Sequence, residues 1–150
     1  MLTNIPLTYL YESDYHQWLS EMIKLIKNSQ FSQLDYANLC EELEALGRSE
    51  KRAVESLLEQ ILIHLLLYQY WETEREYNAN HWRAEIITFR NQINRYLDSQ
   101  TLKNHLESRL AKLYQDALKV VKTKSELRIL PIDCPYTFTQ ILDIDYFPPI

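Results

Sequence analysis

Three glutamates, Glu41, Glu42 and Glu44, form an acidic block in the sequence. Carboxylates on the helices of a bundle can hold two metal ions, but that chemistry takes two Glu-x-x-His motifs and two further inward-facing glutamates. No glutamate of this chain is followed by a histidine three residues later, and no two histidines lie four residues apart. We therefore expect no metal site and predict that these glutamates are solvated or paired with arginines.

Two arginines, Arg83 and Arg90, lie seven residues apart beside an expected apolar helix stripe. A charge at the edge of such a stripe tends to find a counter-charge on a neighbouring helix. We predict that at least one of the two arginines bonds to a glutamate of the 41–44 block. An ion pair that sets the register of two helices is favoured over a ligand site.

One histidine, His64, lies among leucines, with Gln60 and Tyr68 one turn away on either side. A histidine in such a place could transfer protons with a lowered pKa. More often it is a neutral core residue with one satisfied ring nitrogen, and this is the interpretation that we favour. A third hypothesis is a small-molecule pocket near His64, Trp82 and Arg83, which depends on a cavity there.

Arg75 and His81 have an R-x5-H spacing. It resembles the R-x4-6-H motif of HEPN ribonucleases, which are also small helical proteins. The resemblance implies a histidine that acts on the 2′-hydroxyl or the leaving oxygen and an arginine that stabilises phosphate charge. Chance alone gives about half a match in a sequence of this length. Glu76 also stands where a small polar amide would suit that family better, so a ribonuclease is kept only as the alternative function.

Aromatic residues gather around the expected corner between two helices. Tyrosine and tryptophan are common at interfaces because they bury area while keeping a polar tip. Core packing at a helix corner is the favoured interpretation, whereas exposed rings would indicate a surface for a partner or for self-association. The cluster consists of Tyr68, Tyr70, Trp71, Tyr77 and Trp82.

The composition excludes several classes of protein. The 150 residues include one glycine, Gly47, and no proline occurs between residues 7 and 130. Hairpin turns and phosphate-binding loops need glycines, which disfavours an all-β fold, a dinucleotide fingerprint, a P-loop and a nucleophile elbow. We therefore expect no cofactor.

Charge and hydropathy restrict the partners and the location. A net charge of −5 opposes general binding to nucleic acid or to an anionic membrane surface. The longest nearly apolar run, residues 61–68, is well short of a membrane span of about 20 residues. The N-terminal segment does not resemble a secretion signal, and Cys40 and Cys134 form no C-x-x-C pair, so we expect a cytoplasmic protein.

The spacing of apolar residues predicts five helices, of which the third becomes apolar all round and should be central. Gly47 is expected to end the second helix in the left-handed conformation. Thr137 and Gln140 have the spacing of a capping box, which predicts a short helix at residues 138–142. The five helices are expected over about residues 14–28, 35–46, 49–70, 78–97 and 100–123.

Four segments together resemble a known family. Their order and spacing are similar to those of the bacterial family called domain of unknown function twenty-nine, over about residues 9–148. The resemblance implies a compact all-helical protein with no assigned activity and no agreed catalytic residues. The chain has Leu67-Tyr68 where Lys-Trp is usual and Trp71-Glu72 where proline is common, so no role of a basic residue at that helix end is carried over. The segments are LDYANLCEELEALGRSEKR (34–52), ILIHLLLYQY (61–70), NHWRAEI (80–86) and CPYTFTQILDIDYFP (134–148).

The sequence thus predicts a single all-α domain, residues 1–150, with a flexible lead (1–8), a bundle of about five helices (9–123) and an apolar tail packed on it (124–150). We expect a non-enzymatic protein–protein interaction module whose partner is another protein or a second copy of the chain, with no nucleic-acid or membrane partner. The alternative is a HEPN-like ribonuclease that uses Arg75 and His81. The candidate ligand or partner residues are Glu42, His64, Trp71, Trp82, Arg83 and Arg90.

Overall fold

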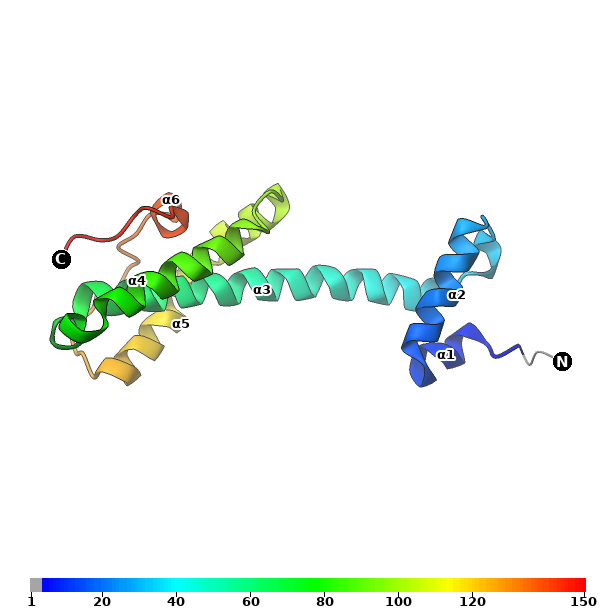
Figure 1. Cartoon of the computed structure of the whole chain (residues 1–150), viewed down its shortest axis with the longest axis horizontal. Coiled ribbons are helices and arrows are strands. Elements are labelled where there is room, and N and C mark those ends of the chain that lie inside the picture. Colours follow the sequence, from blue (N-terminus) through cyan, green and yellow to red (C-terminus); the bar gives the residue numbers. More distant parts are fainter. Residues whose placement is uncertain (1–3) are drawn as a thin grey trace. The chain divides into compact units, whose positions relative to one another are not determined.

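The computed structural model describes residues 4–150, and all the regular secondary structure in this range is helical (Figure 1). This confirms the predicted all-α class, in which an apolar C-terminal tail carries one short helix. A 3-10 helix, η1 (Phe31–Gln33), precedes the longest α-helix. The α-helices are α1 (Leu7–Ser13), α2 (Tyr15–Lys27), α3 (Tyr36–Tyr70), α4 (Glu72–Asn94), α5 (Gln100–Ser125) and α6 (Phe138–Leu142).

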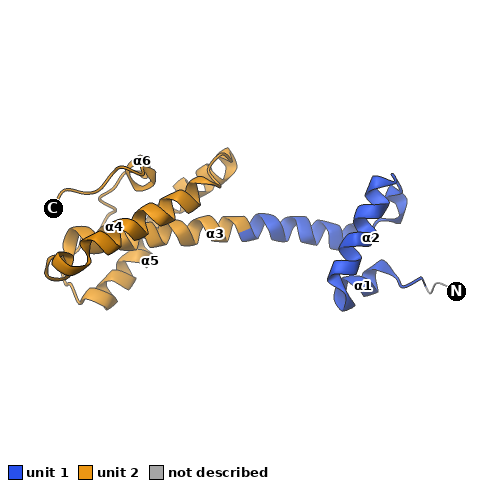
Figure 2. Ribbon diagram, in the orientation of Figure 1, with its two compact units in different colours: residues 1–49 blue, residues 50–150 orange. Residues whose placement is uncertain are grey.

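The chain divides into two compact units, Met1–Ser49 and Glu50–Ile150 (Figure 2). Among the described residues, the core of the first unit has three buried hydrophobic side chains, Leu10, Trp18 and Met22. The core of the second unit has 23. The second unit can therefore be stable through its core alone, whereas the first has little buried apolar area to stabilise it.

The predicted central helix is the second half of α3. Every residue from Ile61 to Tyr68 is buried except His64, which is half-buried. Residues of α4, α5 and the C-terminal tail complete the core around this segment. A helix that is apolar all round needs neighbours on every side, and the second unit supplies them.

The prediction that Gly47 ends a helix is wrong. α3 continues through Gly47 without a break, and no glycine has a positive φ. Strong helix formers flank this position, so the cost of one glycine in a helix, about 1 kcal/mol, does not interrupt it. A Cβ atom at Gly47 would meet nothing within 4 Å, so no close neighbour within the chain requires a glycine there.

The predicted start of the fourth helix, at about residue 78, is also wrong. α4 begins at Glu72, directly after Trp71, which is its N-cap residue. The first two turns of α4 are polar, so apolar spacing could not reveal them. Two glutamates in the first turn stabilise this start, because carboxylates interact favourably with the positive end of a helix.

Side chains cap the start of three other helices. The side chain of Asp14 caps α2, and that of Ser99 caps α5. Thr137 and Gln140 form the predicted capping box at the start of α6. Of the predicted flexible lead, residues 1–3 lie outside the described residues, and Leu7 already belongs to α1.

Candidate functional site

Arg90 holds the C-terminal tail of the second unit. Its guanidinium is fully buried and donates hydrogen bonds from Nε to Ile141 O (2.8 Å), from Nη1 to Tyr146 O (2.6 Å) and from Nη2 to Gln140 O (3.0 Å). Two of these carbonyls belong to α6, near its negative C-terminal end, which suits a cation. Burial lowers the pKa of Arg90 to about 10 and Asp143 opposes this shift, so the group stays charged at neutral pH.

The predicted ion pair between Arg83 or Arg90 and the acidic block is wrong. Within residues 4–150, Glu41 and Glu44 pair instead with Arg48, at 2.9 and 3.8 Å. The guanidinium of Arg83 lies 4.6 Å from the centre of the Phe147 ring, in cation–π contact. The broader prediction, that the glutamates pair with an arginine, is confirmed for Glu41 and Glu44.

Glu42 joins the helices of the first unit. Tyr11 and Tyr15 each donate a hydrogen bond to its carboxylate, both at 2.6 Å. The hydrogen bond from Tyr11, together with the smaller effect of the one from Tyr15, lowers the pKa of Glu42. The hydrogen bond between Tyr11 and Glu42 also raises the pKa of Tyr11 to about 12. Both carboxylate oxygens are therefore engaged within the unit, and Glu42 acts as a structural acceptor for α1 and α2.

His64 lies against the α3 backbone and an aromatic ring. Its Nδ1 atom is 2.7 Å from Gln60 O. A carbonyl oxygen only accepts, so Nδ1 carries the proton. The imidazole centre is 5.3 Å from that of Phe89. Burial lowers the pKa of His64, although the bond to Gln60 opposes the shift. These features favour a neutral histidine with a packing role.

Lowering the pH should destabilise the protein through His64. Its pKa lies below the ordinary value of 6.5 in the folded state, so the unfolded state binds more protons as the pH falls through about 6.5. His64→Gln should reduce this loss of unfolding free energy by at most about 1.4 kcal/mol per pH unit. Urea unfolding between pH 5 and pH 7.5 measures the slope. The exposed His81, replaced by Gln, is the control; equal slopes in both variants would contradict the prediction.

The aromatic cluster is mainly core. Trp82 is buried, and its ring stacks on that of Trp71 with centres 6.0 Å apart. Tyr68 is also buried and packs against Phe147. Only Tyr77 of the five rings is largely exposed, at 79%. The exposure that would mark this cluster as a partner surface is thus limited to one side chain.

Arg75 has a structural role at the end of α3. Its Nε and Nη2 atoms donate hydrogen bonds to Tyr68 O (2.7 Å) and Gln69 O (2.8 Å). A hollow of about 510 Å³ beside Arg75 is also lined by Glu72 and Glu76, whose carboxylates would repel a phosphate. The exposed His81 is not part of this lining. The geometry therefore gives the ribonuclease hypothesis no support.

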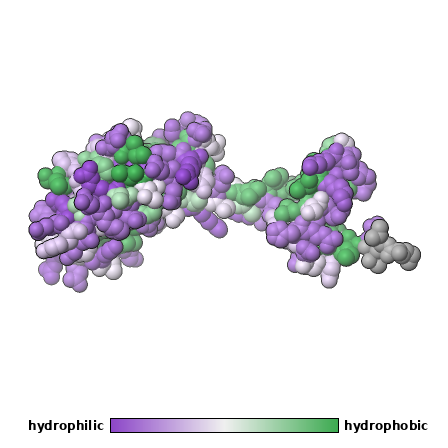
Figure 3. All heavy atoms as spheres, viewed as in Figure 1, coloured by the Kyte–Doolittle hydropathy of each residue, from purple (hydrophilic) through white to green (hydrophobic). Residues whose placement is uncertain are grey.

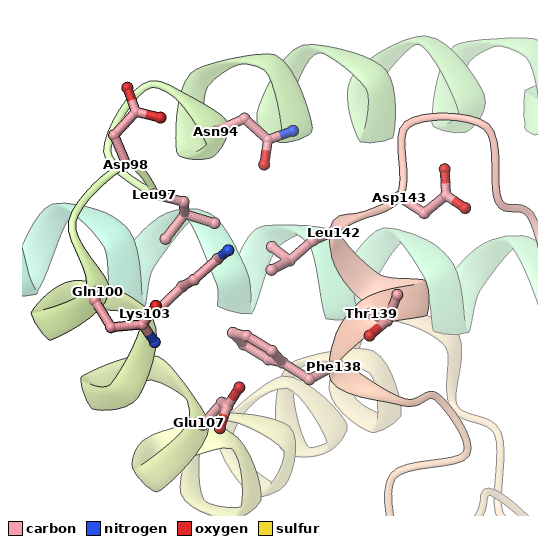
Figure 4. Close-up of a pocket in the computed structure, with 10 residues that line it drawn as sticks. All are labelled: Asn94, Leu97, Asp98, Gln100, Lys103, Glu107, Phe138, Thr139, Leu142 and Asp143. Carbon is pink, nitrogen blue, oxygen red and sulfur yellow. The ribbon is translucent and has the colours of Figure 1, made fainter.

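A second hollow, of about 590 Å³, lies where α4 ends and where α5 and α6 lie beside it (Figure 4). Its lining combines one ammonium group, three carboxylates, two amides, a hydroxyl and apolar side chains. Such a lining can contact both polar and apolar parts of a small molecule. Sequence reasoning missed it because its residues come from three separate segments. They are Asn94, Leu97, Asp98, Gln100, Lys103, Glu107, Phe138, Thr139, Leu142 and Asp143.

Exposed apolar side chains are concentrated in the first unit. Of the 16 large hydrophobic residues that are exposed within residues 4–150, nine precede Glu50, although that part is less than a third of the described chain. Hydrophobic atoms are visible on the surface of the corresponding part of α3 (Figure 3). We call Tyr36, Cys40, Leu43 and Leu46 the α3 apolar face; all four are exposed, Leu43 by 59% and Leu46 by 63%.

The α3 apolar face continues a stripe that is buried further along the same helix. Positions 36, 40 and 43 share their helical face with Val54, Leu58 and Ile61 at 100° per residue. Those three later residues are fully buried in the core of the second unit. Among residues 4–150, the same apolar pattern is therefore buried in the second unit but more than half exposed at Tyr36, Leu43 and Leu46 in the first, which is typical of a contact surface.

The described part of the chain has neither a candidate metal site nor a candidate membrane-spanning helix. Among residues 4–150, no three His, Cys, Asp or Glu side chains are grouped so that they could hold a metal ion. No helix in this range has the length and apolar character needed to cross a bilayer.

Comparison with known proteins identifies a family. A family described as "Domain of unknown function DUF29" matches residues 10–147, which is nearly the whole chain. No curated protein and no solved structure matches it.

Proposed function

Because the chain belongs to the DUF29 family, whose description names no activity, we propose a function from its own geometry. The protein is a protein–protein interaction module, and the α3 apolar face is the surface through which it binds. The observation that carries this proposal is the exposure of Leu43 and Leu46 on a regular helix. Leucines repeated at helical spacing are the anchors by which one helix docks on another or in an apolar groove.

The energetics of the first unit favour the same function. Its core of three buried side chains is small for a unit of this length, and isolated cores of this size contribute only a few kcal/mol. Covering the α3 apolar face would remove further apolar area from water, at roughly 25 cal/mol per Å². Binding would therefore stabilise the first unit as well as hold the partner.

A non-enzymatic role is supported by how the candidate catalytic groups are used. The guanidinium groups of Arg75 and Arg90 bind backbone carbonyls, and the Glu42 carboxylate binds two tyrosines. The ring of His64 packs within the second unit. We also propose a cytoplasmic location, which two cysteines free of disulfide bonds support.

Photo-crosslinking in cells that produce the protein tests this function. With a benzophenone amino acid at position 43, we expect one discrete adduct between the chain and a protein. The same group at Ser108, an exposed residue of α5, is the matched control and should give none. Leu46→Asp should abolish the adduct, because a carboxylate is costly to bury in an apolar contact. No adduct, or equal adducts at both positions, would exclude the α3 apolar face as a binding surface.

A further inference from the structure

We propose that the hollow between α4, α5 and α6 binds a small zwitterion, namely a free α-amino acid with an apolar side chain. The proposal is independent of the α3 apolar face, because every lining residue belongs to the second unit. The volume of about 590 Å³ lies within the range of ligand pockets, about 300–1,000 Å³. The lining offers an ammonium to the ligand's carboxylate, carboxylates to its ammonium and apolar side chains to its side chain.

Opposite charges in the hollow are present but not paired. Lys103 and Glu107 are one helical turn apart on α5 and both line the hollow. Opposite charges at this spacing commonly pair, as Lys112 and Asp116 do on the same helix at 2.5 Å. Within residues 4–150, neither Lys103 nor Glu107 makes an ion pair. The two charges are therefore available to a ligand that carries both signs.

The carboxylate of the ligand would bind at Lys103. This residue is half-buried and lies in the first turn of α5, the positive end of the helix. Lys103 and the free backbone N–H groups at this helix end form the positive part of the lining, whereas Asp98, Glu107 and Asp143 carry negative charge. The ligand's carboxylate would therefore bind at Lys103 and its ammonium at the acidic side chains. Figure 4 shows Lys103 extending from α5 into the hollow.

The ammonium and side chain of the ligand would bind to the other walls. Glu107 can accept hydrogen bonds from an ammonium, and Asp98 and Asp143 add negative potential at the same hollow. Phe138, Leu97 and Leu142 form the apolar part of the lining, and Figure 4 shows the Phe138 side chain extending from α6. A side chain such as that of leucine or phenylalanine would cover these residues.

Calorimetric titration of the 150-residue chain with free amino acids tests the proposal. Leucine or phenylalanine should bind saturably at up to about 10 mM. N-acetyl-leucine lacks the ammonium and leucinamide the carboxylate, and each should bind at least about tenfold more weakly, the value of one charge-assisted hydrogen bond. Glycine lacks the apolar side chain and should also bind at least about tenfold more weakly, because it buries less apolar area. No saturable binding of leucine or phenylalanine would overturn the proposal, as would equal binding of N-acetyl-leucine and leucine.

Variants of the two charged residues identify the site. Lys103→Met and Glu107→Gln should each weaken leucine binding by about tenfold or more. Lys112→Met on the same helix is the matched control and should bind like the wild type. The double variant with Lys103→Glu and Glu107→Lys retains both charges and should recover part of the affinity. Unchanged binding in Lys103→Met, with helical content and melting temperature like those of the control, would place the ligand elsewhere and overturn the site.

Discussion

Replacing Arg90 with methionine should release the C-terminal tail and lower the unfolding free energy by about 3–5 kcal/mol. Methionine fills a similar volume but leaves the carbonyls of Gln140, Ile141 and Tyr146 without the donors that they have now. Buried carbonyls without partners each carry a desolvation cost of about 1–3 kcal/mol. Arg90→Lys should fall between wild type and methionine, because one ammonium cannot match three acceptors arranged around a planar guanidinium.

Urea unfolding with hydrogen exchange of residues 138–147 measures this effect. Arg83 is the matched control because it lies two turns earlier on α4 and is exposed. Its guanidinium lies over the face of the Phe147 ring. Arg83→Met should cost only about 0.5–1 kcal/mol and leave the tail protected from exchange. Similar losses in both variants, or a protected tail in Arg90→Met, would show that the three hydrogen bonds do not hold the tail.

Arg90 also shows where sequence reasoning reaches its limit in this fold. Its place beside an apolar stripe correctly indicates a charge that needs a partner. The partners are backbone carbonyls at the end of α6, about 50 residues away, and every residue type has a carbonyl. Nothing in the side-chain sequence marks those acceptors, so a pairing rule based on glutamates selects the wrong partner.

Local signals in the sequence predict the structure more accurately than rules for interactions between distant residues do. The capping box of Thr137 and Gln140 depends on two side chains three residues apart, and the structure has it as predicted. The continuation of α3 through Gly47 depends on the balance between a glycine's cost and the helix on both sides, which one residue type cannot decide. The first two turns of α4 show no apolar periodicity, so the sequence pattern does not predict where this helix begins.

The candidate sites were less predictable than the helices for a similar reason. Leu43 and Leu58 belong to one apolar stripe, and the sequence gives no sign that one is exposed and the other buried. The difference comes from the neighbours that each part of α3 has. The hollow beside Lys103 likewise requires α6 to lie near α5, which Arg90 helps to ensure by binding the end of α6. Arg90→Met should consequently abolish the binding of leucine that we propose.

We expect the stability of the first unit to depend strongly on Trp18, because this residue is one of only three buried hydrophobic side chains in its described core. The second unit has 23 such residues. Trp18 is 1% exposed, packs on Tyr11 with ring centres 4.9 Å apart, and donates from Nε1 to the buried Asp35 at 3.1 Å. Removing a buried aromatic side chain costs about 3–5 kcal/mol, which equals or exceeds what a core of three residues supplies. Trp18→Ala should therefore unfold the first unit at 25 °C while the second unit, with its 23 core residues, stays folded.

Hydrogen exchange resolved along the chain distinguishes these outcomes. Residues 7–39 should lose protection in Trp18→Ala, whereas residues 54–68 should keep it. Ile23→Ala, on the same helix but 50% exposed, is the matched control and should change stability by about 0.5 kcal/mol or less. Trp18→Phe keeps a ring but removes the donor to Asp35, and should cost about 1–3 kcal/mol. If Trp18→Ala kept protection over residues 7–39, the first unit would be stabilised by contacts other than this core.

The same measurement can be made with the proposed partner bound at the α3 apolar face. If the partner restored protection in Trp18→Ala, binding would be coupled to folding of the first unit. The exposed leucines of a unit with so small a core imply such coupling.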